Sequence, residues 1–514
     1  MPRAIHFIVV TTGLVLFMVA VVWPMIALIR ELMQAPLPSL AYLENVRPWA
    51  LLGRTLLLAG GATALSLLFS LPGAFAIGRI GRMRRAPVLG VILLLPLLCP
   101  PMVYAFGWQS VLDVRAVGTE YVGASWHCIL VWASWSWPIP AMLIGSGWSR
   151  KGRSAYEAAL LVASPASAFL RVALPVLARY LAVAVMMLLA LFAGEYSVPH
   201  ACGLVVYATE LLGWASSSNS IGDVVLPAVP MAGTILFLLG FVAWVGRDFQ
   251  SDRDSPDEPG VDARPSRGLF ALVATVTLIT AVVPIGSLAG KMDSWAVLGE
   301  ALDTYYVELL QSLAVAVATG IGVVLLGCAV VAHRPLRVAG MILTLLYGML
   351  PGALIGEVVV LAYRDIPIVY YEWPLVVIGL IARFAWLGVL VAWLAWAAGA
   401  RELSDQARVD GASEPMVATR IRLAAHFPAL AAGGVVVAVL ALAEIATASL
   451  VRVPSVGLIS LILIEKFHRL EDGMLAALSL WLVIPAVAAA LLAGIALHPW
   501  SLPIRRDSTT DRAR

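Results

Sequence analysis

Residues 156–164, Tyr-Glu-Ala-Ala-Leu-Leu-Val-Ala-Ser, have a counterpart 249 positions later in residues 405–413, Asp-Gln-Ala-Arg-Val-Asp-Gly-Ala-Ser. The two segments align without a gap, so that Ser164 corresponds to Ser413. Each copy lies between two long apolar runs, and each is therefore predicted to be an amphipathic loop between membrane spans. A loop that occurs twice at one offset predicts a chain built from two halves of the same design.

The composition places the whole chain in a membrane. Of its 514 residues, 61% are hydrophobic and only 13% are charged, and the mean hydropathy is +0.93. A soluble domain of this size could not bury so much apolar surface. The net charge of +3 is small, and the basic residues follow the predicted topology, so nucleic-acid binding has no support.

Twelve stretches are apolar and long enough to cross a bilayer core, which takes about 20 helical residues. They cover approximately residues 8–29, 54–78, 88–110, 126–148, 180–200, 224–246, 269–290, 309–332, 338–362, 374–398, 428–450 and 475–497. Most stretches of the second half begin close to 249 positions after a stretch of the first half. We therefore predict an all-α integral membrane protein with two six-span repeats, residues 1–246 and residues 268–498.

Two polar segments complete the predicted organisation. In residues 247–267, ten of 21 residues are charged and three are proline, which is typical of a flexible linker. Residues 499–514 form a polar tail. With the N-terminus inside, 24 of the 34 basic residues lie in inside segments and nine lie in outside segments, so the linker, the tail, both termini and both repeated loops are predicted to be cytoplasmic. Because each half has an even number of spans, the halves enter the membrane in the same direction, as parallel repeats.

The repeated loops carry a family resemblance. Their relevant residues are Glu157, Ala158, Ala159, Ala163 and Ser164 in the first copy, and Asp405, Ala407, Asp410, Gly411, Ala412 and Ser413 in the second. This pattern resembles the EAA signature of membrane subunits of binding-protein-dependent ABC importers, Glu-Ala-Ala followed by three variable residues and Gly-Ala. Leu161 and Val162 replace the usual Asp and Gly of the signature in the first copy, and the second copy has Asp405-Gln406 in place of Glu-Ala.

The resemblance extends from the first span to the last and implies a function. A fused twelve-span chain with two such loops looks most like the ferric-iron group of these permeases, to which thiamine permeases are also similar. It implies the fold of a type I ABC importer membrane domain in the bacterial inner membrane. It further implies two copies of a cytoplasmic ATPase docked at the two loops and an extracytoplasmic binding protein that delivers ferric iron, or alternatively thiamine or another small cationic solute. No catalytic activity, cofactor or resident metal ion is expected of the chain itself.

A second class of protein fits the same spans. An ion-coupled secondary transporter also commonly has twelve spans in two parallel halves. Such a transporter needs no cytoplasmic partner, and it has more protonatable residues at the middle of the membrane.

Four charged residues inside the predicted spans are candidates for the translocation pathway, because charges there usually face a cavity or one another. Glu195 and Glu444 occupy equivalent positions in the fifth and eleventh spans, 249 positions apart. They are predicted to line the pathway. The alternative is that both side chains lie near the outer membrane interface, where water hydrates their carboxylates. Glu357 and Arg383, in the ninth and tenth spans, are expected to form an ion pair between helices.

Other polar and aromatic residues are predicted to have structural roles. Trp126, Trp132, Trp135 and Trp137 of the fourth span are expected to be interfacial anchors, with cation–π contacts to a cationic solute as the alternative. The four cysteines are expected to be small core residues, and the histidines show no metal-binding spacing.

Overall fold

A computed structural model describes residues 2–34, 44–80, 86–113, 123–217, 221–246, 267–333, 335–397, 401–413 and 416–497. The predicted tail and all but the last residue of the predicted linker lie outside these ranges. Within them, every regular element is a helix. Arg267, the last residue of the predicted linker, begins a helix.

The elements before the linker are α1 (Pro2–Phe17), η1 (Met18–Val22), α2 (Trp23–Gln34), α4 (Val46–Ile80), α5 (Ala86–Leu98), α6 (Pro101–Leu112), α7 (Ala124–Ser136), α8 (Pro138–Gly147), η2 (Trp148–Gly152), α9 (Arg153–Leu160), α10 (Pro165–Ala168), η3 (Phe169–Ala173), α11 (Leu174–Ala193), α12 (Ser197–Ala201), α13 (Tyr207–Ser217) and α14 (Gly222–Gly246). Those after it are α16 (Arg267–Thr277), η5 (Leu278–Val282), α17 (Val283–Ser287), η6 (Leu288–Lys291), α18 (Ala296–Ala332), α19 (Arg337–Gly348), α20 (Gly352–Tyr363), α21 (Pro367–Tyr370), α22 (Trp373–Ala397), α23 (Arg401–Val409), η7 (Val417–Leu423), α25 (Ala424–Leu442), α26 (Ala446–Leu450), α27 (Ile459–His468) and α28 (Asp472–Leu497).

The prediction of a multi-pass membrane protein is confirmed. Among the described residues, nine helices are long and apolar enough to cross a bilayer, and the number reaches twelve if each of three bent helix pairs is one span. The bent pairs are α5 with α6, α7 with α8, and α19 with α20, at angles of 84°, 47° and 110°. Helices suit this setting because their backbone hydrogen bonds are satisfied within the segment.

Proline explains two of the bends. α5 ends before Pro100, α19 ends before Pro351, and both prolines have extended ψ angles, 132° and 137°. A proline has no N–H to continue the ladder, and its ring clashes with a helical residue before it. In both places the chain therefore leaves one helix and starts another in a new direction.

The predicted fifth and eleventh spans, residues 180–200 and 428–450, are wrong in their C-terminal ends. The fifth spanning helix covers Pro165–Ala193 and the eleventh covers Ala424–Leu442. After each helix the chain makes a break of three residues, and a five-residue helix follows, α12 in one case and α26 in the other. Each break contains one of the glutamates predicted for the pathway, Glu195 in the first break and Glu444 in the second.

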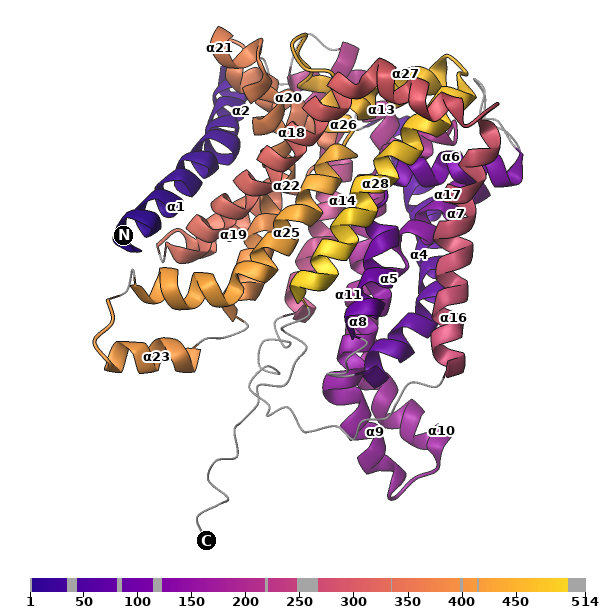
Figure 1. Ribbon diagram of the computed structural model, residues 1–514, viewed down its shortest axis with the longest axis vertical. Helices are drawn as coiled ribbons and strands as arrows, with labels where there is room; N and C mark the ends of the chain where they lie inside the picture. Colours follow the sequence, from indigo (N-terminus) through magenta and orange to yellow (C-terminus); the bar gives the residue numbers. More distant parts are fainter. Residues whose placement is uncertain are drawn as a thin grey trace.

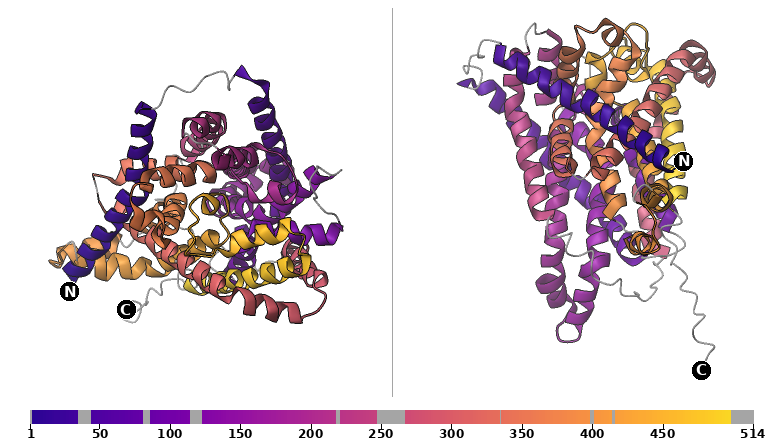
Figure 2. Two further views of the ribbon diagram at one scale, coloured as in Figure 1. Left: turned by 90° about the horizontal axis from the view of Figure 1, so that it is seen from above. Right: turned by 90° about the vertical axis from the view of Figure 1, so that its left-hand side faces the viewer.

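The first helices of the two parts of the chain pack against the other part. α1 lies against α18 and α2 against α20, whereas α16 lies against α4 and α17 against α6. Figure 1 shows α1 and α2 at one edge of the bundle and α16 at the opposite edge, and the view from above in Figure 2 shows α1 beside the later helices. The two parts of the chain therefore interlock.

A π turn lies at each of these interlocking contacts. Within η1, the Val19 carbonyl accepts a hydrogen bond from the Tyr363 hydroxyl, 2.7 Å away. Within η5, the Thr280 hydroxyl accepts a hydrogen bond from Trp137 Nε1, 3.0 Å away. A π turn disturbs the regular helical ladder locally. Both π turns coincide with polar contacts between the two parts of the chain.

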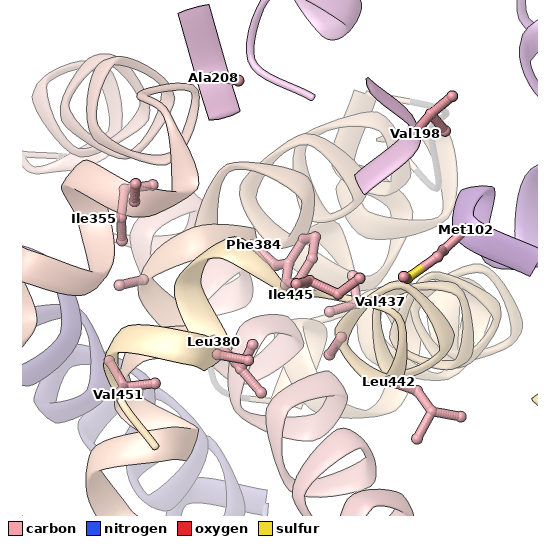
Figure 3. Packing of buried hydrophobic residues seen from close by; sticks show 14 of the residues in the cluster. Met102, Val198, Ala208, Ile355, Leu380, Phe384, Val437, Leu442, Ile445 and Val451 are labelled. Atoms are coloured by element: carbon pink, nitrogen blue, oxygen red, sulfur yellow. The ribbon is translucent and has the colours of Figure 1, made fainter. Parts of the chain in front are cut away.

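One large apolar core joins the two parts. It includes Met102 of α6 and Val198 of α12 from the first part, and Phe384 of α22 and Val437 of α25 from the second, as Figure 3 shows. Since this core is continuous across both parts, relative motion of the parts would have to slide or repack it.

The repeated loops project from one end of the molecule. In Figure 1, α9 and α10 lie at the lower right and α23 at the lower left, whereas α13, α21 and α27 lie at the upper end. The two loops are therefore on the same side of the bundle.

Candidate functional site

The first repeated loop is a short exposed helix followed by a proline-initiated turn. Glu157 is exposed and pairs with Arg153, with Nε and Oε1 2.8 Å apart. The helix ends with hydrogen bonds from the backbone amides of Val162 and Ala163 to the Ala159 carbonyl. Ser164 then adopts an extended conformation before the next helix. This loop turns without a left-handed residue.

The second repeated loop turns on a glycine. After α23, the amide of Ala412 donates to the carbonyl of Ala407 at 2.9 Å, and the amide of Gly411 donates to the carbonyl of Arg408 at 3.0 Å. This pair of bonds forms a Schellman turn, which needs a left-handed residue at its centre. Gly411 has a φ of +84° and supplies this left-handed residue.

The tips of the two loops expose apolar side chains. Leu161 and Val162 are 85% and 90% exposed in the first loop, and Val409 is 88% exposed in the second. The second loop also exposes the carboxylates of Asp405 and Asp410, of which Asp405 pairs with Arg408 at 2.6 Å. Each tip can therefore contact another protein through apolar side chains, and both loops also expose carboxylates, Glu157 in the first and Asp405 and Asp410 in the second.

The remaining predicted docking residues lie close to these tips. Ala158, Ser164 and Gly411 are exposed, and Ala159, Ala163, Ala407, Ala412 and Ser413 are half-buried. Behind the second loop, Ser404 of α23 and Val417 of η7 are fully buried, and α23 packs against η7. The loops are exposed at their tips and anchored at their bases.

The side chain of Glu195 caps the helix that follows the break after α11. Its carboxylate accepts hydrogen bonds from Trp132 Nε1 at 2.9 Å, from the Val198 amide at 3.1 Å and from the Ser197 amide at 2.7 Å, and it also contacts the Ser197 hydroxyl. A carboxylate here satisfies backbone donors at the start of α12 that have no helical partner. Glu195 thus fixes the position of α12 relative to α7.

Glu444 closes the matching break after α25. Its Oε1 accepts the Thr447 amide at 3.0 Å, and its Oε2 lies 3.9 Å from Arg383 Nε. Arg383 also donates through one nitrogen to the carbonyls of Gly348 and Leu350, at 3.0 and 2.7 Å. Glu444 and Arg383 therefore connect the break after α25 to the bend between α19 and α20.

At the bend between α5 and α6, a tryptophan has the role that Arg383 has at the bend between α19 and α20. Trp135 Nε1 donates to the Leu97 carbonyl at 3.2 Å, at the end of α5. Trp135 of α7 and Arg383 of α22 both belong to the next span after the bend, and both bond carbonyls that the bend leaves without a helical partner. Different side chains thus support the two bends in similar ways.

The predicted ion pair between Glu357 and Arg383 is wrong. Arg383 has Glu444 as its acidic neighbour, and among the described residues Glu357 has no ion pair. The bend of 110° between α19 and α20 explains the error, because it redirects the helix that carries Glu357. Sequence spacing along a straight span could not reveal this change of direction.

The expectation of an interfacial tryptophan belt is wrong for three of the four residues in the predicted fourth span. Trp126 is 75% exposed, in keeping with an anchor, but Trp132 and Trp137 are fully buried and Trp135 is 6% exposed. The three buried indoles donate hydrogen bonds to Glu195, Thr280 and Leu97. Buried tryptophans usually find such partners.

Two groupings of polar residues were missed by the sequence analysis. Cys202 Sγ lies 3.4 Å from His127 Nδ1, although Cys128 and Cys202 are buried core residues as expected. The imidazoles of His200 and His468 lie with their ring centroids 5.2 Å apart. No motif joins residues 268 positions apart, so only the fold could bring this pair together.

Comparison of the chain with models of protein families, with curated proteins and with solved structures finds no match.

The contacts of Glu195 predict a loss of stability on neutralisation. Glu195→Gln keeps one acceptor oxygen but turns an amide group toward backbone donors. Hydrogen bonds to charged groups contribute about 1.5–3 kcal/mol each, so the free energy of unfolding should fall by about 2 kcal/mol. The midpoint of thermal unfolding in detergent measures the effect. Glu357→Gln is the matched control and should unfold close to the parent, whereas an unchanged midpoint for Glu195→Gln would contradict the capping role.

Proposed function

We propose that this chain is the membrane permease subunit of a binding-protein-dependent ABC importer. The observation that carries the proposal is the pair of EAA-like loops, which lie 249 positions apart in sequence and project from one end of an all-helical membrane bundle. One amphipathic loop is common in membrane proteins, but two at one offset and on one side provide paired contacts for two copies of a cytoplasmic partner.

We further propose that the chain is two parallel six-span repeats, residues 1–246 and 268–498. Four features at corresponding places support this organisation. They are the bends at Pro100 and Pro351, the breaks at Glu195 and Glu444, the short helices α12 and α26, and the reciprocal packing of the first helix of each part against the other part. Random arrangement of spans would not repeat these features in the same order.

The loops have a direct mechanical route to the breaks. One continuous spanning helix, which contains the π turn η3 near its start, runs from Pro165, next to the first loop, to Ala193, next to Glu195. Its 29 residues span about 40 Å at 1.5 Å per residue. In the second part, η7 and α25 run in the same way from the second loop to the break at Glu444. Closure of two ATPase subunits on bound ATP would draw the loops together, and these helices would carry the motion to the outer ends of the bundle.

The proposed membrane orientation follows the basic residues. With 24 of them inside and nine outside, the loops face the cytoplasm and the ends near α13 and α27 face outward. An extracytoplasmic binding protein would then deliver solute at the outer end, and the proposed location is the bacterial inner membrane.

The proposed solute is ferric iron, with thiamine or another small cation as the alternative. This proposal of a solute rests on the family resemblance. Glu195 and Glu444 would contribute negative charge near the outer end of the pathway. Because both carboxylates already accept hydrogen bonds from the chain, their first role in this account is to hold α12 and α26 in place.

The proposal is tested by what accompanies the tagged chain when it is purified from its native membrane in mild detergent. We expect an ABC ATPase and, in the presence of solute, a binding protein, and mass spectrometry identifies both. Transport by the chain alone in liposomes, driven by an ion gradient and without any ATPase, would instead establish a secondary transporter.

A further inference from the structure

Two histidines from the two parts of the chain meet near the outer end of the bundle. His200 belongs to α12, and His468 is the last residue of α27. Their rings are 5.2 Å apart between centroids, with an interplanar angle of 78°. Neither residue lies in one of the long membrane-spanning helices. His200 lies between the spanning helices Pro165–Ala193 and Gly222–Val245, and His468 lies between Ala424–Leu442 and Asp472–Gly494.

Both imidazoles are carried by helices that end in a fixed turn. After α12, the amide of Gly203 donates to the His200 carbonyl at 3.0 Å, and Leu204 donates to Pro199 at 2.9 Å. After α27, Leu470 donates to Phe467 and Glu471 donates to Lys466 in the same pattern. These Schellman turns hold the last residues of each helix in place. Leu470 is even left-handed, with a φ of +58°, which leucine rarely adopts.

α12 is further attached to the first part of the chain on three sides. Gln109 Nε2 donates to the Ala201 carbonyl at 2.8 Å, and Trp132 and the capping contacts of Glu195 hold the start of the helix. The Tyr196 ring stacks on His200 with centroids 4.9 Å apart. The His200 ring is therefore positioned before any ligand arrives.

The ring of His200 retains an unused ligand atom. His200 Nε2 is buried and has no hydrogen-bond partner in the described structure. Neutral imidazole nitrogen is the form of histidine that binds metal ions. A buried nitrogen without a partner is costly, and a ligand would remove that cost.

The separation of the rings matches that of two imidazoles on one metal ion. Zinc–nitrogen bonds are about 2.0–2.1 Å and the coordination is tetrahedral, which puts the centroids of two bound rings about 5 Å apart. Imidazole nitrogen is a preferred ligand of zinc, copper and nickel ions. Among the described residues, no group of three or more His, Cys, Asp or Glu side chains is placed to hold a metal.

We propose that His200 and His468 form a two-histidine site for a divalent transition-metal ion of the zinc class, which bridges the two parts of the chain at the outer end. Water molecules complete the coordination. An ion held there ties α12 to α27 and opposes any movement that separates them. This inference does not depend on the transported solute, and metal binding can be measured without an ATPase or a binding protein.

The test is a titration of the purified full chain, free of any affinity tag, with zinc chloride in detergent at pH 7.5. Calorimetry should detect one ion per chain that the variants His200→Gln and His468→Gln each bind at least about tenfold more weakly, since loss of residues even outside the coordination sphere costs metal sites this much. His333→Gln is the control, because His333 caps α18 far from the pair in sequence, and it should bind as the parent does. Zinc should also raise the thermal unfolding midpoint of the parent and of the control, but not of the two variants.

Cobalt provides a second measurement that is independent of variant folding. Co²⁺ bound to the parent should give the visible absorption of a nitrogen-ligated ion, and zinc should displace it. Equal zinc affinity in the parent and both variants, or no cobalt absorption in the parent, would overturn the proposal. Loss of ATPase copurification with intact zinc binding would remove the proposed transport function and leave the metal site standing.

Discussion

Gly411→Val is expected to abolish association with the ATPase and transport, while the protein still reaches the membrane in normal amounts. A Cβ at this position meets no atom within 4 Å, so steric crowding is not the reason. The reason is the backbone, because Gly411 has a φ of +84° and a β-branched residue in the left-handed region costs about 1–3 kcal/mol. The loop would relieve this strain by unwinding the Schellman turn, and the residues on both sides of it would lose their placement. Copurification of the ATPase and solute uptake in vesicles measure the outcome.

Two variants separate the effect of the backbone from that of a changed surface. Gly411→Asn should retain most activity, because asparagine tolerates the left-handed region. Val162→Gly, at the corresponding place of the first loop, should be tolerated, since Val162 is 90% exposed and is not left-handed. Normal ATPase binding and transport by Gly411→Val would show that this turn has no part in coupling.

Arg383→Met is expected to have the largest effect on stability. The guanidinium bonds two carbonyls at the bend between α19 and α20 and lies next to Glu444, with only 20% of the side chain exposed. Removing one partner of a buried ion pair typically costs about 3–5 kcal/mol, because the other charge stays buried without compensation. We therefore expect a much lower thermal unfolding midpoint in detergent and little protein in the membrane.

The charge left on Glu444 accounts for part of this loss, and a double variant measures that part. Arg383→Met combined with Glu444→Gln should be more stable than Arg383→Met alone, because no uncompensated carboxylate remains. If the single and the double variant unfold at the same temperature, the ion pair contributes nothing, and only the two carbonyl bonds matter.

The spans could be predicted from the sequence because hydropathy over about 20 residues reports membrane insertion directly. All twelve predicted stretches correspond to a spanning helix or to a bent helix pair. This prediction depends only on local properties of the chain.

The bends and breaks could not be predicted in the same way. Leu350-Pro351 reads as part of one apolar run, yet the chain turns there by 110°. The position of Glu195 and Glu444 in the predicted spans gives no sign that their carboxylates accept backbone hydrogen bonds of the residues that follow. Such contacts depend on where the chain goes after the break, and hydropathy carries no information about that direction. The burial of Trp132 and the meeting of His200 with His468 depend on packing between distant segments for the same reason.

The most direct test of the account is the composition of the complex bound to the two loops. A photoreactive amino acid placed at Val162 in one preparation and at Val409 in another should crosslink to the same ATPase polypeptide, because both tips are exposed at one end of the bundle. The intact complex should contain two ATPase subunits for each chain, as its mass in native mass spectrometry will determine. Absence of any ATPase from the complex, together with no crosslink at either loop, would contradict the proposal that this chain is the permease of an ABC importer.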